Sequence, residues 1–278
     1  MKNGIVIMFD DAFFKYAKIC INSIEANYPK HPDLLIFYNG DDPAVISFLR
    51  KKKKLKIMDY EKDRKKSLGI NVDELNLGVG KSTENFSKYL MWTDAFTDYD
   101  KLIHLDADTA VLKPLDFMFE ADEFFGVSYN FDTLINPEMA SDPQLVKLLE
   151  EDKIPYPDQQ LKMMNAGVFM IPKRYRTPTQ LQLLKEITLK YDRYNRFADQ
   201  GAISLWCQKN NISFNDLYQY NFSGFFYTAF FEGFDYSNIH IFHFAAEWKP
   251  DGPVYKIALE VSKHILGLHE KVEKYMAN

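Results

Sequence analysis

Short apolar runs alternate with helical repeats in the N-terminal part of the chain. Runs rich in β-branched residues predict strands, whereas apolar residues spaced three or four positions apart predict helices. The pattern predicts strands over 4–9, 33–39 and 55–60, and helices over 12–28 and 43–53 between them. This alternation is typical of a parallel sheet with helices packed on its faces.

The rest of the chain continues the pattern with longer polar interruptions. Loop-rich segments are predicted over 61–82 and 131–162, where glycines, prolines and other turn residues accumulate. We find no internal repeat and no linker rich in glycine and serine, so one domain over 1–278 is the simplest organisation. Further strands are expected just before Asp106 and at 124–130, 163–172 and 240–244, with helices at 85–97, after Pro114, and at 178–192, 199–208 and 253–276.

An apolar run that begins at Leu102 leads directly into two carboxylates, Asp106 and Asp108, which are separated by the small residue Ala107. In an extended segment, alternate residues project from the same face, so the two acids repel each other unless a cation lies between them. Such an Asp-x-Asp pair also occurs in an ordinary solvated loop at the end of a strand. Other parts of the chain must therefore decide between a metal site and a loop.

Composition narrows the function classes. The hydrophobic share of 46% and the charged share of 26% are typical of a globular protein with a substantial core. The formal net charge of −5 gives no support to a nucleic-acid-binding function. Cys20 and Cys207 form no spaced motif, which argues against a zinc cluster or a disulfide framework. Without a signal-peptide pattern or a membrane-length apolar run, a cytoplasmic location is the expectation.

Five stretches occur in an order that resembles glycosyltransferase family 8, whose members include glycogenin and lipopolysaccharide galactosyltransferases and have a GT-A fold. The closing motif of that family usually reads His-x-x-Gly-x-x-Lys-Pro-Trp, whereas this chain has Ala246 in place of the glycine and Asp251 in place of the tryptophan. The stretches are IVIMFDDAFFKYAKICINSI, FSKYLMWTDAFTDYDKLIHLDADTAVLKPLD, NAGVFMI, ADQGAISLW and HIFHFAAEWKP, which together span residues 4 to about 250.

The resemblance implies an α/β fold: a GT-A type, Rossmann-like nucleotide-binding domain with a mixed, mainly parallel central sheet flanked by helices. It further implies a nucleotide-sugar-binding half over 1–115, a donor-sugar and acceptor half over 116–252, and a C-terminal helix over 253–278. The implied activity is metal-dependent, retaining transfer of a hexosyl group from a UDP-sugar. The acceptor is a glycan, a lipid-linked saccharide, a protein or a polyol.

The resemblance also implies a metal site formed by Asp106, Asp108 and His243. Carboxylate and phosphate oxygens suit Mg²⁺ or Mn²⁺, and an added imidazole nitrogen favours Mn²⁺. His240 is the poorer ligand because it lies on the opposite face of a regular strand. A histidine in an aromatic strand is also often an ordinary core residue, which is the alternative for His243.

The expected donor-binding residues come from several stretches. They are Ile7, Phe9, Asp10, Asp11, Lys88, Asp106, Ala107, Asp108, Asn165, Ala166, Gly167, His243 and Lys249. Several polar members have a structural alternative: Asp10 and Asp11 also suit helix caps, and Lys88 also suits a helix surface. Lys249 is expected to stabilise the leaving diphosphate, unless it is an exposed loop lysine.

Asp199 and Gln200 are the residues expected to face the reactive carbon of the sugar. Asp199 is either a nucleophile or a group that caps its helix and holds sugar hydroxyls, whereas the neutral amide of Gln200 is a poor nucleophile. The aromatic tract 221–236 forms either core or a wall on which a sugar stacks. The competing functions are a sugar-nucleotide pyrophosphorylase, whose usual glycine-rich basic loop is missing from IVIMFDDAFF, and a non-catalytic nucleotide-sugar-binding protein.

Overall fold

A computed structural model describes the chain over residues 1–58, 83–133, 142–154, 162–195, 198–214, 217–223, 236–245, 249–252 and 263–277. The contacts between residues divide the chain into two units. Unit 1 comprises Met1–Lys2, Glu61–Leu102 and Ala121–Asp216, and unit 2 comprises Asn3–Tyr60, Ile103–Glu120 and Leu217–Asn278. The functional division into halves at residue 115 stays a prediction.

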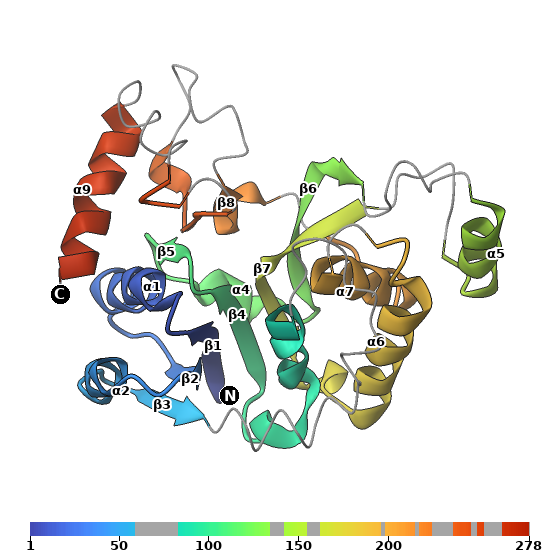
Figure 1. Cartoon of the computed structure of the whole chain (residues 1–278), viewed down its shortest axis with the longest axis horizontal. Coiled ribbons are helices and arrows are strands. Elements are labelled where there is room, and N and C mark those ends of the chain that lie inside the picture. The colour runs from blue at the N-terminus through green and yellow to red at the C-terminus, as the bar shows by residue number, and fades with distance from the viewer. Residues whose placement is uncertain are drawn as a thin grey trace. The chain divides into compact units, whose positions relative to one another are not determined.

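Unit 2 contains the strand–helix alternation predicted from the N-terminal sequence (Figure 1). Strands β1 and β2 are parallel, as are β2 and β3, and the strand order is β3-β2-β1-β4. A smaller sheet has the order β5-β9-β8. The bounds are β1 Asn3–Asp10, β2 Asp33–Asn39, β3 Leu55–Met58, β4 Lys101–Asp106, β5 Thr109–Val111, β8 Phe222–Ser223, β9 Ile241–His243, α1 Phe14–Asn27, α2 Pro43–Arg50, α4 Asp116–Glu120 and α9 Lys263–Ala277.

Helix α1 is the main covering element of unit 2, because it packs on both β5 and α9. Its apolar face joins a buried cluster that includes Ile19, Phe222, Phe242 and Val272. Phe222 is fully buried, so the described start of the aromatic tract contributes to the core. Residues 224–235 of that tract lie outside the described residues.

In unit 1, β6 Phe125–Thr133 pairs antiparallel with β7 Lys162–Pro172. The central sheet is therefore mixed and mainly parallel, as predicted. Helices α6 Pro178–Tyr191 and α7 Ala198–Lys209 pack together, and α7 also packs on β7. Trp92, Phe169 and Trp206 form the aromatic centre of this unit, with ring centroids of Trp92 5.9 Å from Phe169 and 5.2 Å from Trp206.

The sequence pattern missed some elements. The predicted helix 85–97 is a pair of 3₁₀ segments, Thr83–Trp92 and Asp94–Phe96, separated where Thr93 adopts an extended conformation and caps the second one. The predicted loop 131–162 contains helix α5, Pro143–Glu151. Its start is set by the Asp142 side chain, which accepts a hydrogen bond from the Gln144 amide.

Other predictions stand close to their observed bounds. The closing helix was expected over 253–276, and its described part is α9; residues 253–262 and the predicted loop 61–82 lie outside the described residues. Cys20 and Cys207 are buried free thiols. Among the described helices, none has the length and apolar character needed to cross a membrane.

Candidate active site

The two acids of the Asp-x-Asp pair occupy a tight connection between β4 and β5. The Thr109 hydroxyl donates a hydrogen bond to the Asp106 carbonyl at 2.9 Å, which closes the turn. Asp108 and Ala107 are buried, with exposed fractions of 6% and 4%. This burial contradicts the solvated-loop interpretation for Asp108, because a buried carboxylate requires charged or hydrogen-bonding partners.

The pairing of β5 with β9 delivers a histidine to this connection. These strands are antiparallel, and Thr109 is opposite His243. The Phe244 amide then donates to the Asp108 carbonyl at 2.8 Å, which fixes the end of β9 beside the acids. A histidine far away in the sequence is thereby placed next to both carboxylates.

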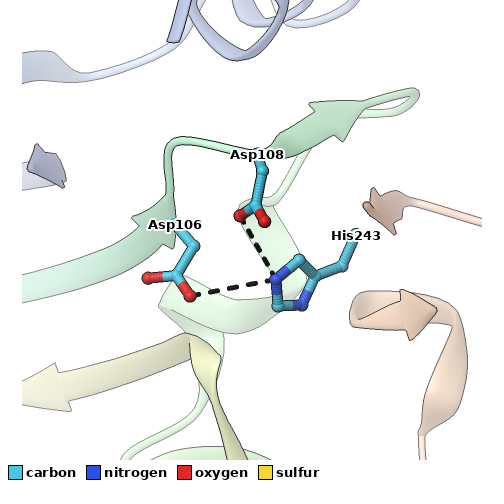
Figure 2. A group of neighbouring side chains, drawn as sticks. All are labelled: Asp106, Asp108 and His243. Carbon is cyan, nitrogen blue, oxygen red and sulfur yellow. Dashed lines mark ion pairs between the residues drawn. The ribbon is translucent and has the colours of Figure 1, made fainter. Parts of the chain in front are cut away.

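The three predicted metal ligands converge (Figure 2). Nε2 of His243 lies 3.3 Å from an oxygen of Asp108 and 3.8 Å from an oxygen of Asp106. One ligand atom from each residue lies within 4.8 Å of the others. Ligands about 2.1 Å from an octahedral ion are separated by roughly 3 Å at neighbouring positions and roughly 4 Å at opposite ones. The donor set, and the 3.3 and 3.8 Å distances from His243 Nε2 to the two acids, therefore fit a divalent cation such as Mn²⁺ or Mg²⁺.

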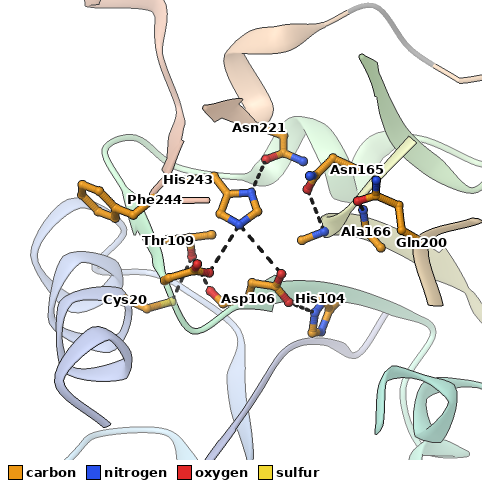
Figure 3. Close-up of polar contacts among 12 residues, drawn as sticks. Cys20, His104, Asp106, Thr109, Asn165, Ala166, Gln200, Asn221, His243 and Phe244 are labelled. Carbon is orange, nitrogen blue, oxygen red and sulfur yellow. Dashed lines mark hydrogen bonds and ion pairs between the residues drawn. The ribbon is translucent and has the colours of Figure 1, made fainter. Parts of the chain in front are cut away.

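The orientation of the His243 ring is set by Asn221, which sequence reasoning missed. His243 Nδ1 and Asn221 Oδ1 are 3.0 Å apart, and Asn221 is fully buried (Figure 3). Since an amide oxygen only accepts, Nδ1 is the donor in this contact, and Nε2 is the ring nitrogen that faces the acids and would bind a metal ion. Metal-binding histidines usually have such a partner on their other nitrogen.

His104, which sequence reasoning also missed, contacts Asp106. It is a buried residue of β4, and its Nε2 lies 2.9 Å from Asp106 Oδ1. Being two residues apart on one strand, the two side chains share a face. His240, by contrast, contacts the Pro114 carbonyl through Nδ1 and stacks on Tyr220, in agreement with its rejection as a ligand.

Lys249 contacts Asp108. Its ammonium group forms an ion pair with Asp108 and donates to the Phe244 carbonyl at 2.9 Å. Burial of the Asp108 carboxyl opposes ionisation, but His243 and Lys249 outweigh it, so the pKa of Asp108 lies below its ordinary value. The Lys249 side chain is 21% exposed, so its interpretation as an exposed loop lysine is wrong.

The end of β1 provides buried backbone and two acids. Ile7 and Phe9 are buried, and the amide of Phe13 donates to Asp10 at 3.0 Å in the turn before α1, whose N-cap residue is Phe13 itself. Asp11 is exposed and accepts a hydrogen bond from the Tyr38 hydroxyl. Both acids therefore have structural partners, and nucleoside binding by this strand end stays a prediction.

In unit 1, Lys88 and Asp199 form a nearly buried ion pair. The Lys88 ammonium lies 3.1 Å from the Asp199 carboxylate, and the two side chains are 14% and 11% exposed. The interpretation of Lys88 as a solvated helix-surface residue is therefore wrong. Asp199 stands in the first turn of α7, as predicted.

The start of α7 also contacts strand β7. The Ala166 amide donates to Gln200 Oε1 at 3.1 Å, and the Gly167 amide donates to Asn165 Oδ1 at 2.8 Å (Figure 3). Gln200 also contacts the Met163 sulfur at 3.3 Å. These contacts hold both the oxygen and the nitrogen of the Gln200 amide against β7.

Comparison with protein-family models gives the match that decides the assignment. The family described as Glycosyl transferase family 8 matches residues 4–250. The chain belongs to glycosyltransferase family 8. This family 8 chain is therefore a glycosyltransferase, and the alternative of a sugar-nucleotide pyrophosphorylase is wrong. A comparison with curated proteins gives no match.

Solved structures agree with the GT-A fold of this family 8 glycosyltransferase. The galactosyltransferase LgtC, in complex with donor and acceptor sugar analogues, has a TM-score of 0.64 at 16% identity, over 99% of this chain and 95% of LgtC. GlyE of Streptococcus pneumoniae TIGR4 has a TM-score of 0.58 at 20% identity, over 96% of this chain and 63% of GlyE. Mouse xyloside xylosyltransferase 1 has a TM-score of 0.53 at 13% identity, over 87% of this chain and 97% of the mouse protein.

The predicted site residues of the family 8 chain fall into two groups. Those of unit 2 are the acid pair, His243, Lys249 and the end of β1. Those of unit 1 are Lys88, 165–167, Asp199 and Gln200. Local sequence offered no signal for Asn221, since a buried asparagine before a short strand has no distinctive spacing.

Proposed function

We propose that this family 8 glycosyltransferase transfers a hexosyl group from a UDP-sugar, with a divalent metal ion and with retention of anomeric configuration. The observation that carries the proposal is the convergence of Asp106, Asp108 and His243, with the ring nitrogen of the histidine directed at both acids. The metal set is intact, so no observation favours a protein of this fold that only binds nucleotide-sugars.

These three residues hold the ion in the proposal, with Mn²⁺ favoured over Mg²⁺ because one ligand is an imidazole nitrogen. When bound, the ion supplies positive charge between the carboxylates and the donor diphosphate, and it stabilises charge on the leaving group. Asn221 and His104 keep the histidine and Asp106 oriented. Ligands held in place beforehand lose less conformational freedom when the ion arrives.

Lys249 acts on the leaving diphosphate in this proposal. Its ammonium already lies beside Asp108, and so beside the position assigned to the ion. A fixed positive charge stabilises the transition state more than the bound donor, because charge on the diphosphate grows as the sugar–phosphate bond breaks. The lysine therefore contributes to the rate more than to binding.

Asp199 and Gln200 act on the sugar in this proposal. Asp199 is paired with Lys88, and a carboxylate held by an ammonium is a weakened nucleophile, so we assign it to holding sugar hydroxyls. Gln200 and Asn165 present neutral dipoles to the sugar. The acceptor then attacks the face that the diphosphate leaves, and the diphosphate takes the proton of the acceptor. Ile7, Phe9, Asp10 and Asp11 hold the uridine.

A thermal-shift screen of nucleotide-sugars tests the donor class. Because a ligand that binds only the native state raises the melting temperature, UDP-sugars should raise it in Mn²⁺ and raise it less in EDTA. At 100 times Kd the expected stabilisation is about 2.7 kcal/mol. Asp108→Asn is the matched variant and should lose the Mn²⁺-dependent part of the shift. A larger shift with ADP- or GDP-sugars would contradict the choice of uridine.

A further inference from the structure

The turn 249–252 is attached to the first turn of α1 by Asp251. One carboxylate oxygen of Asp251 accepts a hydrogen bond from the hydroxyl of Tyr16 at 2.8 Å, and the other pairs with Lys15. The turn itself is closed by the Gly252 amide, which donates to the Lys249 carbonyl at 2.8 Å. Asp251 therefore fixes the short segment that carries Lys249.

Tyr16 of α1 and Phe13, the residue just before the helix, also contact the Lys249 side chain. The ammonium of Lys249 lies 5.5 Å from the ring centroid of Tyr16 and 5.6 Å from that of Phe13. These distances are within the range of cation–π attraction. Tyr16 thus contacts Asp251 through its hydroxyl and Lys249 through its ring.

We propose that Asp251 is a positioning residue for Lys249, holding the turn against α1 so that the ammonium stays beside Asp108. The proposal rests on the function proposed above for Lys249. Position 251 is one at which the chain departs from the usual closing motif of family 8, with an aspartate in place of the tryptophan. Its effect reaches the reacting groups only through Lys249.

The Tyr16 contact carries most of the effect. Lys15 and Asp251 are both about half exposed, at 50% and 51%, and exposed ion pairs contribute little. Tyr16 is 9% exposed, and its hydroxyl donates to a charged carboxylate, a kind of hydrogen bond about twice as strong as one between neutral groups, so replacing the carboxylate with a neutral amide weakens it. Lys15 lowers the pKa of Asp251, so the carboxylate stays ionised at neutral pH.

The test compares Asp251→Asn with Asp33→Asn. The control removes another lysine–aspartate pair, since Asp33 lies 2.6 Å from Lys56 at the opposite end of β2 from the site. We expect Asp251→Asn to lower kcat about tenfold while changing the Kd of UDP less, and Tyr16→Phe to do the same. Asp33→Asn should change neither. Equal kcat values in the two aspartate variants would overturn the proposal.

A second comparison shows whether Asp251 acts through Lys249. Residues that act as one unit have non-additive effects, so Asp251→Asn should lower kcat no further in a Lys249→Ala background. A full additional loss in that background would overturn the proposal. If Lys249→Ala lowers kcat and Asp251→Asn does not, the positioning role fails and the proposed function of Lys249 stands.

A readout without turnover separates this proposal from the proposed function. Lys249 is only 21% exposed, and its ammonium is held by Asp108 and the Phe244 carbonyl. Limiting N-hydroxysuccinimide acetate should therefore acetylate Lys249 severalfold faster in Asp251→Asn than in the wild type or Asp33→Asn, as measured by peptide mass spectrometry. Equal acetylation rates would overturn the positioning role even if every donor assay failed.

Discussion

Replacing Asn221 with leucine removes the acceptor for His243 and keeps a side chain of similar size. The wild-type contact holds the proton on Nδ1, at 3.0 Å from Asn221 Oδ1. Without it, the buried imidazole can carry its proton on Nε2 instead, and a protonated Nε2 cannot bind a metal ion. The variant should therefore bind Mn²⁺ more weakly although all three ligands remain.

The expected magnitude follows from the burial of both groups. Loss of an outer hydrogen-bond partner typically weakens metal binding by about 10- to 100-fold, or about 1.4–2.7 kcal/mol. Because His243 is 3% exposed, its Nδ1–H would also be left buried without a hydrogen-bond acceptor, which would lower the free energy of unfolding by about 1–3 kcal/mol. Weaker metal binding and a lower melting temperature should occur together.

Titration of Mn²⁺, followed by the electron paramagnetic resonance signal of the free ion, measures the affinity. Asn22→Leu is the matched control, because Asn22 is another buried asparagine of unit 2 and donates to the Tyr275 carbonyl of α9 at 2.6 Å. It should lower the melting temperature but leave Mn²⁺ affinity unchanged. A folded Asn221→Leu protein with wild-type Mn²⁺ affinity would refute the role given to Asn221.

Two further predictions concern the groups around the donor. Lys249→Ala should lower kcat by about 100-fold and weaken UDP binding much less, and an unchanged kcat in steady-state assays would remove Lys249 from the mechanism. Gln200→Ala should keep partial activity and Asp199→Asn should lose more. In both variants NMR of the product made from a UDP-α-sugar should show an α-linkage, and a β-linkage would contradict retention.

The sequence pattern was sufficient to predict elements whose bounds depend on their own residues. The strand 33–39 was predicted with its observed bounds, because its apolar run is buried on both faces and ends at polar residues. Helix 178–192 was close to the observed Pro178–Tyr191, since a threonine cap followed by proline marks its start. The choice of His243 over His240 needed the strand period and the family motif together.

The missed features depend on contacts between distant residues. Strand β5 has only three residues, and its existence depends on pairing with β9, more than a hundred residues later in the chain. The Lys88–Asp199 pair and the Asn221–His243 contact likewise join separate elements. No local spacing encodes such pairs, because tertiary packing decides them.

Release of UDP from the donor, measured with and without metal, tests the assignment of Asp106, Asp108 and His243 most directly. We predict that EDTA abolishes turnover and that added Mn²⁺ restores it. Asp108→Asn should lose most activity at any Mn²⁺ concentration. Because Asp108 is buried, circular dichroism is used to check that the variant is folded. Full turnover by the wild-type enzyme in EDTA would contradict a metal site at these residues.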